Sequence, residues 1–224
     1  MLQTLWSLKG GVGVSVSAAA LATSLAHRGQ DTLLVDLAGD QPALLGLAEP
    51  AGPGVLDWLV ARGEPDSLSR LRVPVVDRLG LLPSGRGAVD GRHPGPLDGG
   101  RLAAALDGLA EHVVVDAGVV GGRFTVGGHA ELVAGLADAG RSLLVTRACY
   151  LALRRGVQEP PRADGVVLVA DAGRGLDRHD VAAVLGLPVL AVLEADPSVA
   201  RRVDAGLVAR RPLRLLERGL RELV

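Results

Sequence analysis

Several residue types are scarce in this 224-residue sequence, and each scarcity excludes a class of protein. Cys149 is the only cysteine, so the chain forms no internal disulfide and no zinc site built from thiolates, as is typical of the reducing cytoplasm. Aromatic residues make up only 2% of the chain, so the core has to be built from leucine, valine and alanine. No apolar run is long enough to cross a bilayer, and a formal net charge of -1 provides no overall field that attracts nucleic acid or a membrane surface.

Lysine is also scarce, and the position of the one lysine is informative. Of the 24 cationic residues, Lys9 alone is a lysine, and it lies beside a glycine-rich segment. A coding bias towards arginine explains the other cationic residues. A lysine that persists against such a bias indicates a position where a compact ammonium does what a planar guanidinium cannot do.

Apolar runs alternate with amphipathic stretches along the whole chain. The predicted strands are Leu2–Leu8, Thr32–Asp36, Gly80–Leu82, His112–Asp116, Ser142–Thr146, Gly165–Ala170 and Leu187–Leu193. The predicted helices are Ser15–His27, Val55–Arg62, Gly100–Leu109, Ala130–Ala137, Tyr150–Arg155, Asp177–Leu185, Ser198–Ala209 and Leu213–Leu223. This order predicts an α/β fold in which a mostly parallel central sheet carries helices on both faces. We expect residues 1–224 to form a single domain, with residues 83–100 as a flexible insert.

The first predicted strand runs into a glycine-rich loop, KGGVGVS, and then into a helix. Glycines allow successive backbone N–H groups to point at an anion, and the helix start adds a partial positive charge. Ser15 stands where a hydroxyl would bind Mg²⁺, whereas Val14 stands where a general phosphate-binding loop has its lysine. A tight strand-to-helix turn without a ligand is the alternative interpretation.

The KGGVGVS segment resembles the deviant Walker A motif, KGGxGK[ST], of the ParA/MinD family of P-loop ATPases. Lys9 matches the additional "signature" lysine of that family, Ser15 matches the Mg²⁺ ligand, and Val14 replaces the second lysine. Three glycines match the pattern, at Gly10, Gly11 and Gly13. A degenerate loop of this kind also resembles the CpaE/TadZ branch, which takes part in pilus assembly.

Two later strands extend the resemblance. TLLVDLAGD (32–40) resembles the Walker A′ strand, with Asp36 as its first acid and Ala38 in place of the second. HVVVDAGVV (112–120) resembles the Walker B strand, with Asp116 as its acid. Asp36 is the one candidate for a catalytic role. Either acid alone would often be a turn or cap residue, and Asp40 is expected to cap the following helix rather than to replace the missing acid.

The resemblance implies a set of site residues. The implied nucleotide-binding residues are Lys9, Gly10, Gly11, Val12, Gly13, Val14, Ser15, Asp196 and Pro197, the last two beside the adenine. The implied metal ligands are Ser15, Asp36 and Asp116.

The missing residues suggest a weak or inactive nucleotide site. Loss of one charged donor to phosphate costs about 1.5–3 kcal/mol, roughly a ten- to hundredfold loss of affinity. Loss of electrostatic stabilisation at the transferred phosphoryl group lowers the rate about 10²–10³-fold, and the replacement of the second acid by Ala38 lowers the rate further. We therefore expect ATP or ADP with Mg²⁺ to bind weakly, if at all, and any ATPase activity to be very slow.

The resemblance implies a positioning or assembly factor for septum placement, chromosome partition or pilus assembly, acting as a homodimer with a protein partner. The alternative is a nucleotide-independent scaffold, a pseudo-ATPase that dimerises constitutively and binds DNA or protein. A metabolic enzyme of the same fold is disfavoured, because a reductase would need two cluster cysteines and a ligase would need the missing phosphoryl-transfer residues.

The C-terminal stretch 199–224 is rich in arginine and would allow non-specific DNA binding, although interleaved acids favour a solvated helix face. The last predicted helix has leucines on one side, which we expect to pack on the sheet rather than to anchor the chain in a membrane. These leucines are Leu213, Leu216, Leu220 and Leu223.

Overall fold

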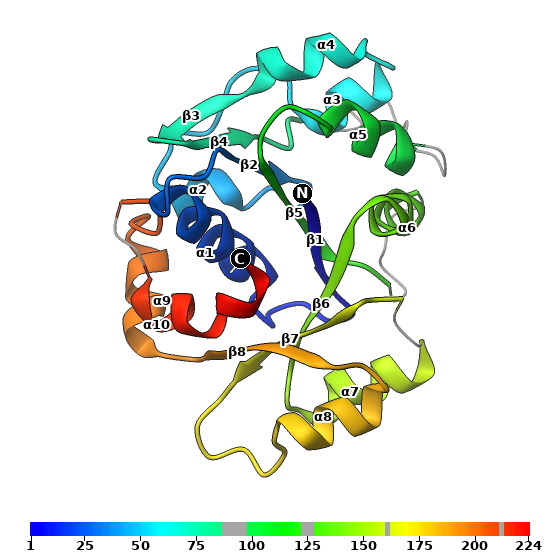
Figure 1. The fold of residues 1–224 in the computed structure, drawn as a ribbon, viewed down its shortest axis with the longest axis vertical. Helices are drawn as coiled ribbons and strands as arrows, with labels where there is room; N and C mark the ends of the chain where they lie inside the picture. The colour runs from blue at the N-terminus through cyan, green and yellow to red at the C-terminus, as the bar shows by residue number, and fades with distance from the viewer. Residues whose placement is uncertain (87–97, 122–127, 160–161, 211–212) are drawn as a thin grey trace.

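An eight-stranded sheet forms the centre of the computed structural model, which describes residues 1–86, 98–121, 128–159, 162–210 and 213–224 (Figure 1). The strand order is β3-β4-β2-β5-β1-β6-β7-β8. The strands are β1 (Leu2–Ser7), β2 (Thr32–Asp36), β3 (Val73–Val76), β4 (Leu79–Leu82), β5 (His112–Val119), β6 (Arg141–Arg147), β7 (Gly165–Ala170) and β8 (Val189–Glu194). Most of the insert expected at residues 83–100 lies outside the described residues.

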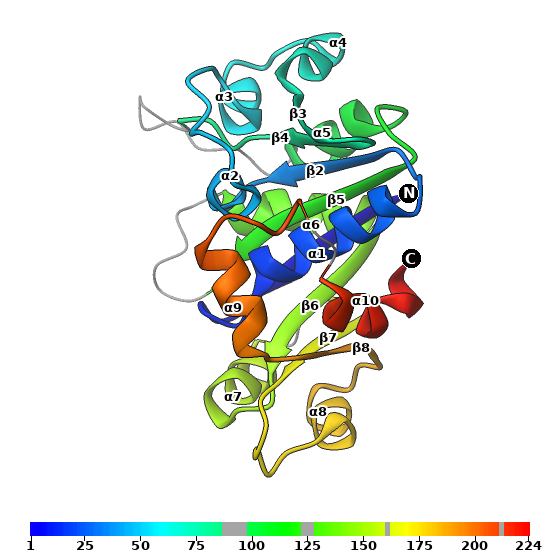
Figure 2. The ribbon, with the colours of Figure 1, turned by 90° about the vertical axis from the view of Figure 1, so that its left-hand side faces the viewer.

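Helices cover both faces of this sheet. They are α1 (Val14–His27), α2 (Gln41–Leu45), α3 (Val55–Val60), α4 (Pro65–Leu68), α5 (Asp98–Leu106), α6 (His129–Ala139), α7 (Tyr150–Gln158), α8 (Arg178–Leu185), α9 (Pro197–Asp204) and α10 (Arg214–Gly219), with short 3₁₀ turns at Ser69–Leu71 and Arg221–Leu223. Figure 2 shows α1, α9 and α10 on one face, with α5 and α6 behind the sheet. Neighbouring described strands pair in parallel except β3 with β4. The predicted mostly parallel sheet with helices on both faces is confirmed.

Helix α1 is the centre of one of the two cores. Its sequence is rich in alanine and small polar residues, and nearly all of it is buried between the sheet and α10. Small side chains allow a helix to lie close to a sheet, so α1 is held rigidly directly behind the glycine loop. This rigidity fixes the position of the loop.

The C-terminal leucines pack into the same core, as the sequence predicts. The four buried side chains are Leu213, Leu216, Leu220 and Leu223. The Gln3 side-chain amide in β1 donates a hydrogen bond of 2.9 Å to the carbonyl of Leu223. These leucines are therefore unavailable to a membrane in the folded chain. Within the described residues, no helix combines the length and apolar character that a membrane span requires.

The structure differs from the sequence prediction in several short elements. Helix α2 was expected only as a helix after Asp40, without bounds, and helix α4 and strand β3 were not predicted, because four- and five-residue elements carry too little periodicity. Pro74 is tolerated in β3 because this strand lies at the sheet edge. The predicted helix Ser198–Ala209 ends at Asp204, and the predicted helix Leu213–Leu223 is divided after Gly219, whose Cα lies against the backbone of β8.

Candidate functional site

The glycine loop joins the end of β1 to the start of α1. Gly11 and Gly13 have φ of +74° and +101°, a backbone region that other residues rarely adopt. A Cβ atom at Gly11 would meet no heavy atom within 4 Å, so the space above the loop is open there. The first N–H groups of α1 lack intrahelical partners, and they make this helix start a suitable site for an anion.

The two ends of the loop differ in charge. Lys9 is half-buried, and its ammonium donates a hydrogen bond of 3.3 Å to the Gly10 carbonyl. Val14 is the first residue of α1, with 6% of its surface exposed, and it packs in the core together with Val12. The loop therefore has an ammonium at its beginning and an apolar side chain where a second ammonium would lie.

Two buried carboxyl groups lie next to the loop. Strands β2 and β5 are neighbours, and their parallel register pairs Asp36 with Asp116. Both residues are 0% exposed. The Asp36 carboxylate accepts three backbone N–H groups of the following turn, at Ala38 (3.0 Å), Gly39 (2.7 Å) and Gln41 (3.1 Å). Asp36 therefore shapes its own loop with both oxygens.

The Asp116 carboxylate also has several donors. It accepts a hydrogen bond of 2.7 Å from the Gln41 side chain and one of 3.1 Å from the Gly118 amide, and the nearby Ser15 side chain favours its charged form. The sequence-predicted set Ser15, Asp36 and Asp116 is thus brought together at the carboxyl ends of the central strands.

Burial raises the pKa of both acids. The pKa of Asp36 rises from 3.8 to about 6 because burial disfavours the charged form, and the nearby Asp116 raises it further, against the opposing effect of the backbone hydrogen bonds. Burial likewise raises the pKa of Asp116, and the hydrogen bonds from Gln41 and Ser15 oppose this rise. Ionisation of these two buried carboxyl groups is therefore unfavourable and strains the folded chain.

This strain predicts an unusual pH dependence. Between pH 4 and 6 the folded chain retains a proton on Asp36 that the unfolded chain releases, so the free energy of unfolding falls as pH rises through this window. We expect the natural chain, in EDTA, to lose about 2 kcal/mol of stability relative to Asp36→Asn between pH 4.5 and 7.5. Urea unfolding of both proteins at the two pH values measures this difference, and parallel pH profiles would contradict it.

Gln41 is a site residue that sequence reasoning missed. It begins α2 and is 0% exposed. Its side-chain nitrogen donates to the Ser15 carbonyl (3.0 Å) and to Asp116, while its backbone N–H donates to Asp36. Its side-chain oxygen is buried without a hydrogen-bond partner among the described residues. No local pattern marks this glutamine, because its partners come from three different elements.

Asp40 and Ala38, which lie in the loop after Asp36, contribute no hydrogen-bonding side chain to the described site. Asp40 occupies the N-cap position of α2, but its side chain makes no capping hydrogen bond and is exposed, so the expected side-chain cap is wrong. Ala38 is exposed, and its Cβ lies 3.1 Å from the point where a Cβ at Gly118 would lie. Ala38, which stands in place of the second acid, thus faces Gly118 across adjacent loops.

A cavity of about 410 Å³ opens beside the loop, on the side opposite to the acids in the strand order. Gly13 and Val16 line one wall, and Asp196 and Pro197 at the start of α9 line another. The Asp196 carboxylate accepts the Ser198 backbone N–H at 2.6 Å and so caps α9. A mostly apolar pocket of this size, adjoining an anion-binding loop, suits a nucleotide base and its ribose.

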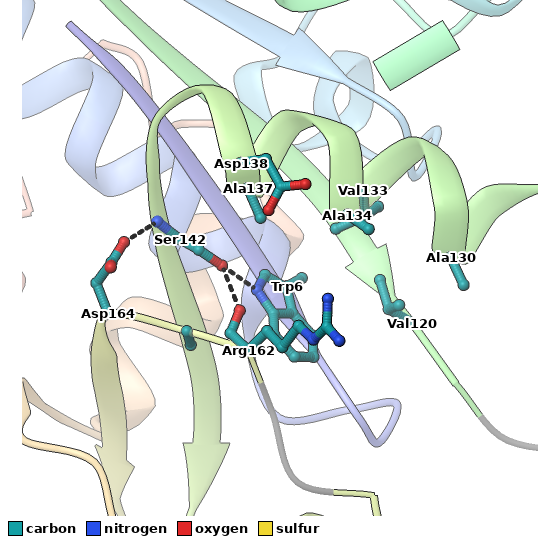
Figure 3. A pocket seen from close by; sticks show the side chains of 11 residues that line it. Trp6, Val120, Ala130, Val133, Ala134, Ala137, Asp138, Ser142, Arg162 and Asp164 are labelled. Carbon is teal, nitrogen blue, oxygen red and sulfur yellow. Dashed lines mark hydrogen bonds between the residues drawn. The ribbon is translucent and has the colours of Figure 1, made fainter. Parts of the chain in front are cut away.

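A second cavity of about 370 Å³ lies under α6, on the other face of the sheet (Figure 3). Trp6 forms part of its lining, and its indole N–H donates to the Ser142 hydroxyl at 2.9 Å. The Ser142 backbone N–H in turn donates to Asp164 at 2.7 Å. Ala130, Ala134 and Ala137 of α6 contribute only small side chains, which leaves the space open. None of the described residues that line this cavity belongs to the glycine loop.

The residues at the loop fit one part of a Mg²⁺ nucleotide and not the other. Open space above Gly11, two left-handed glycines and the start of a buried helix fit a phosphate group. The acids do not fit Mg²⁺, because both oxygens of Asp36 accept backbone N–H groups and Asp116 is occupied by the Gln41 amide. A divalent cation would have to displace the Gln41 amide from Asp116 and compete with the backbone donors of Asp36.

Comparison with known proteins identifies the family of the domain and its fold. The CobQ/CobB/MinD/ParA nucleotide binding domain matches residues 4–208. A search of curated protein sequences finds no match. Similar solved structures include MinD complexed with Mg-ADP from Pyrococcus horikoshii, with 19% identity and a TM-score of 0.73 over 99% of this chain and 93% of that one.

Two further structures show the same fold. The MinC:MinD cell division complex of Aquifex aeolicus has 19% identity and a TM-score of 0.75, covering 99% of this chain and 94% of that one. A ParA family ATPase from Chlorobium tepidum has 19% identity and a TM-score of 0.75, covering 98% of this chain and 96% of that one.

Proposed function

The chain belongs to the CobQ/CobB/MinD/ParA nucleotide-binding family, and from this premise we propose that it is a ParA/MinD-like positioning, partitioning or assembly factor with a degenerate nucleotide site. Septum placement, chromosome partition and, through a resemblance to the CpaE/TadZ branch, pilus assembly are the candidate processes. The observation that carries the proposal is the open glycine loop joined to the cavity that Gly13, Asp196 and Pro197 line.

We propose that this site binds ATP or ADP weakly and hydrolyses ATP very slowly or not at all. Residues 9–13 and the start of α1 would hold the phosphates, and the cavity at Asp196 would hold the base. Val14 supplies no charge to the phosphates, and Ala38 supplies no group to orient an attacking water. The relative from Pyrococcus horikoshii, which is complexed with Mg-ADP, supports an adenine nucleotide as the ligand.

The partners are a second copy of this chain and a protein of a positioning or assembly system. In a homodimer Lys9 would reach the partner's nucleotide, and the MinC:MinD complex supports a protein partner. Exposed arginines of the C-terminal region would add non-specific, salt-dependent DNA binding. These arginines are Arg201, Arg210, Arg214, Arg218 and Arg221.

The single lysine gives a direct test of nucleotide binding. An amine-reactive ester has two targets in this chain, Lys9 and the Met1 amine, and the Met1 amine donates to the Glu111 carbonyl at the opposite end of β1. We expect ATP or ADP, at a few times its dissociation constant, to slow acylation of Lys9 about fivefold while the Met1 amine reacts unchanged. Peptide mass spectrometry measures both rates in one sample.

An acylation rate of Lys9 that is the same with and without millimolar nucleotide would instead favour the alternative function. That alternative is a nucleotide-independent scaffold that dimerises constitutively and binds DNA or protein. One observation supports this alternative, since the protein's own Gln41 already occupies the acid pair. A melting temperature that does not change with ATP, in a protein that elutes as a dimer, is the result that this second function predicts.

A further inference from the structure

The acid pair beside the glycine loop lacks a cationic partner. None of the ion pairs within the described residues involves Asp36 or Asp116. Two adjacent buried carboxyl groups normally require a cation or a set of hydrogen-bond donors. In this chain the donors include backbone N–H groups and one residue that serves both acids, because Gln41 donates to Asp36 with its backbone N–H and to Asp116 with its side-chain amide.

The Gln41 side-chain amide also connects the acids to the loop. Its nitrogen lies 2.7 Å from an oxygen of Asp116 and 3.0 Å from the carbonyl oxygen of Ser15. The Ser15 side chain also lies near this carboxylate. The two N–H groups of the amide thus point at two oxygens from different elements, as a bound cation would be surrounded by oxygen atoms.

The surrounding structure fixes this arrangement. Gln41 is fully buried, and Pro42 follows it in the first turn of α2. Gly46 at the end of α2 lies against Gly206 so closely that a Cβ at Gly46 would be 2.2 Å from the Gly206 carbonyl oxygen. Helix α2 therefore rests on the loop after α9, and it cannot withdraw Gln41 without breaking that contact.

We propose that the Gln41 side-chain amide occupies the position of a divalent cation between Ser15 and Asp116, so that the glycine loop binds nucleotide without Mg²⁺. The second half of this statement rests on the proposed function. The first half concerns only this chain and is tested without nucleotide. The orphaned side-chain oxygen of Gln41 is consistent with an amide held by its nitrogen alone.

The cation experiment compares melting temperatures in EDTA and in millimolar Mn²⁺ or Mg²⁺ for the natural chain, Gln41→Ala and Gln41→Glu. Removing the amide opens the position, and a glutamate adds a third carboxylate to it. We expect the natural chain to change by less than about 1 °C and both variants to gain about 5 °C from the cation. Adding Asp116→Asn to either variant should abolish the gain.

A natural chain that gains as much from Mg²⁺ as the variants, with the gain lost in Asp116→Asn, would overturn the proposal. Absence of any gain in Gln41→Ala would also overturn it, since an opened site would then have no affinity for a cation. Gln41→Glu is prepared in Mn²⁺ throughout if it does not fold in EDTA, and Gln41→Ala alone then provides the comparison in both buffers.

The nucleotide experiment is a calorimetric titration of the natural chain with ADP, in EDTA and in Mg²⁺. We expect dissociation constants that agree within about twofold, because no cation is required. Binding that is tenfold tighter in Mg²⁺ would overturn metal-independent binding. If ADP binds in neither buffer, the proposed function fails while the cation experiment still decides the role of Gln41.

Discussion

A Val14→Lys variant is expected to bind ATP about ten- to a hundredfold more tightly than the natural chain. Val14 is the first residue of α1 and lies between the loop and the core. A lysine there would bury its stem among the apolar neighbours and extend its ammonium towards the open loop. Each charged hydrogen bond to a phosphate contributes about 1.5–3 kcal/mol, which gives the expected gain in affinity.

The matched control is Val14→Met, which has an unbranched side chain without charge. Calorimetric titration with ATP should show the gain in the lysine variant and no gain in the methionine variant. Both variants should lose about 1–2 kcal/mol of stability, because each replaces a compact buried side chain. Equal affinity in the two variants would indicate that the loop does not hold phosphate.

The higher ATP affinity of Val14→Lys should not be accompanied by faster ATP hydrolysis. Ala38 still lacks the acid that would orient water, and Gln41 still occupies Asp116. A phosphate-release assay on Val14→Lys is therefore expected to show turnover close to that of the natural chain. Rapid turnover in this variant would show that the lost lysine alone had inactivated the site.

A Gly46→Ala variant is expected to lose about 3 kcal/mol of stability or more. Gly46 ends α2 with φ of +70°, and a Cβ there would lie 2.2 Å from the Gly206 carbonyl oxygen. The atoms that this Cβ would meet belong to the Gly206 backbone, which cannot move aside as a flexible side chain does. The loss should be accompanied by weaker packing of α2 and hence by displacement of Gln41.

Gly186→Ala is the matched control for this contact. Gly186 also ends a helix with a left-handed φ of +65°, but a Cβ there would meet no heavy atom within 4 Å. The control should lose only about 1 kcal/mol, the cost of the backbone conformation itself. Urea unfolding of both variants separates the two contributions, and equal losses would mean that helix α2 adapts without cost.

The sequence predicted the parts of the site that a local pattern records. Alternating apolar runs predicted the central strands, and the glycine loop lies between β1 and α1 as expected. Asp36 and Asp116 each follow an apolar strand, and a parallel sheet brings such strand ends to one edge. Their proximity therefore follows from the order of the motifs along the chain.

The contacts of the site were not predictable in this way. Gln41 appears as an ordinary polar residue in a short, weakly periodic segment, and its partners lie in β5 and at the start of α1. Sequence reasoning assigned Asp36 to a metal, whereas in the structure it stabilises its own turn. A hydrogen bond between residues 75 positions apart depends on where whole elements pack, and no local pattern records that.

The sequence by itself thus indicated the family through the resemblance of its motifs. It also determined the mostly parallel sheet and the loop whose glycines free the backbone, because these depend on periodicity and on conformations that only glycine adopts readily. Only the tertiary structure decided how the buried acids are satisfied. Backbone contact between Gly46 and Gly206 sets the position of α2, and α2 in turn places Gln41 so that its backbone N–H reaches Asp36 and its side-chain amide reaches Asp116. The physical reason is that a buried charge takes whichever donor the packing brings within hydrogen-bond distance.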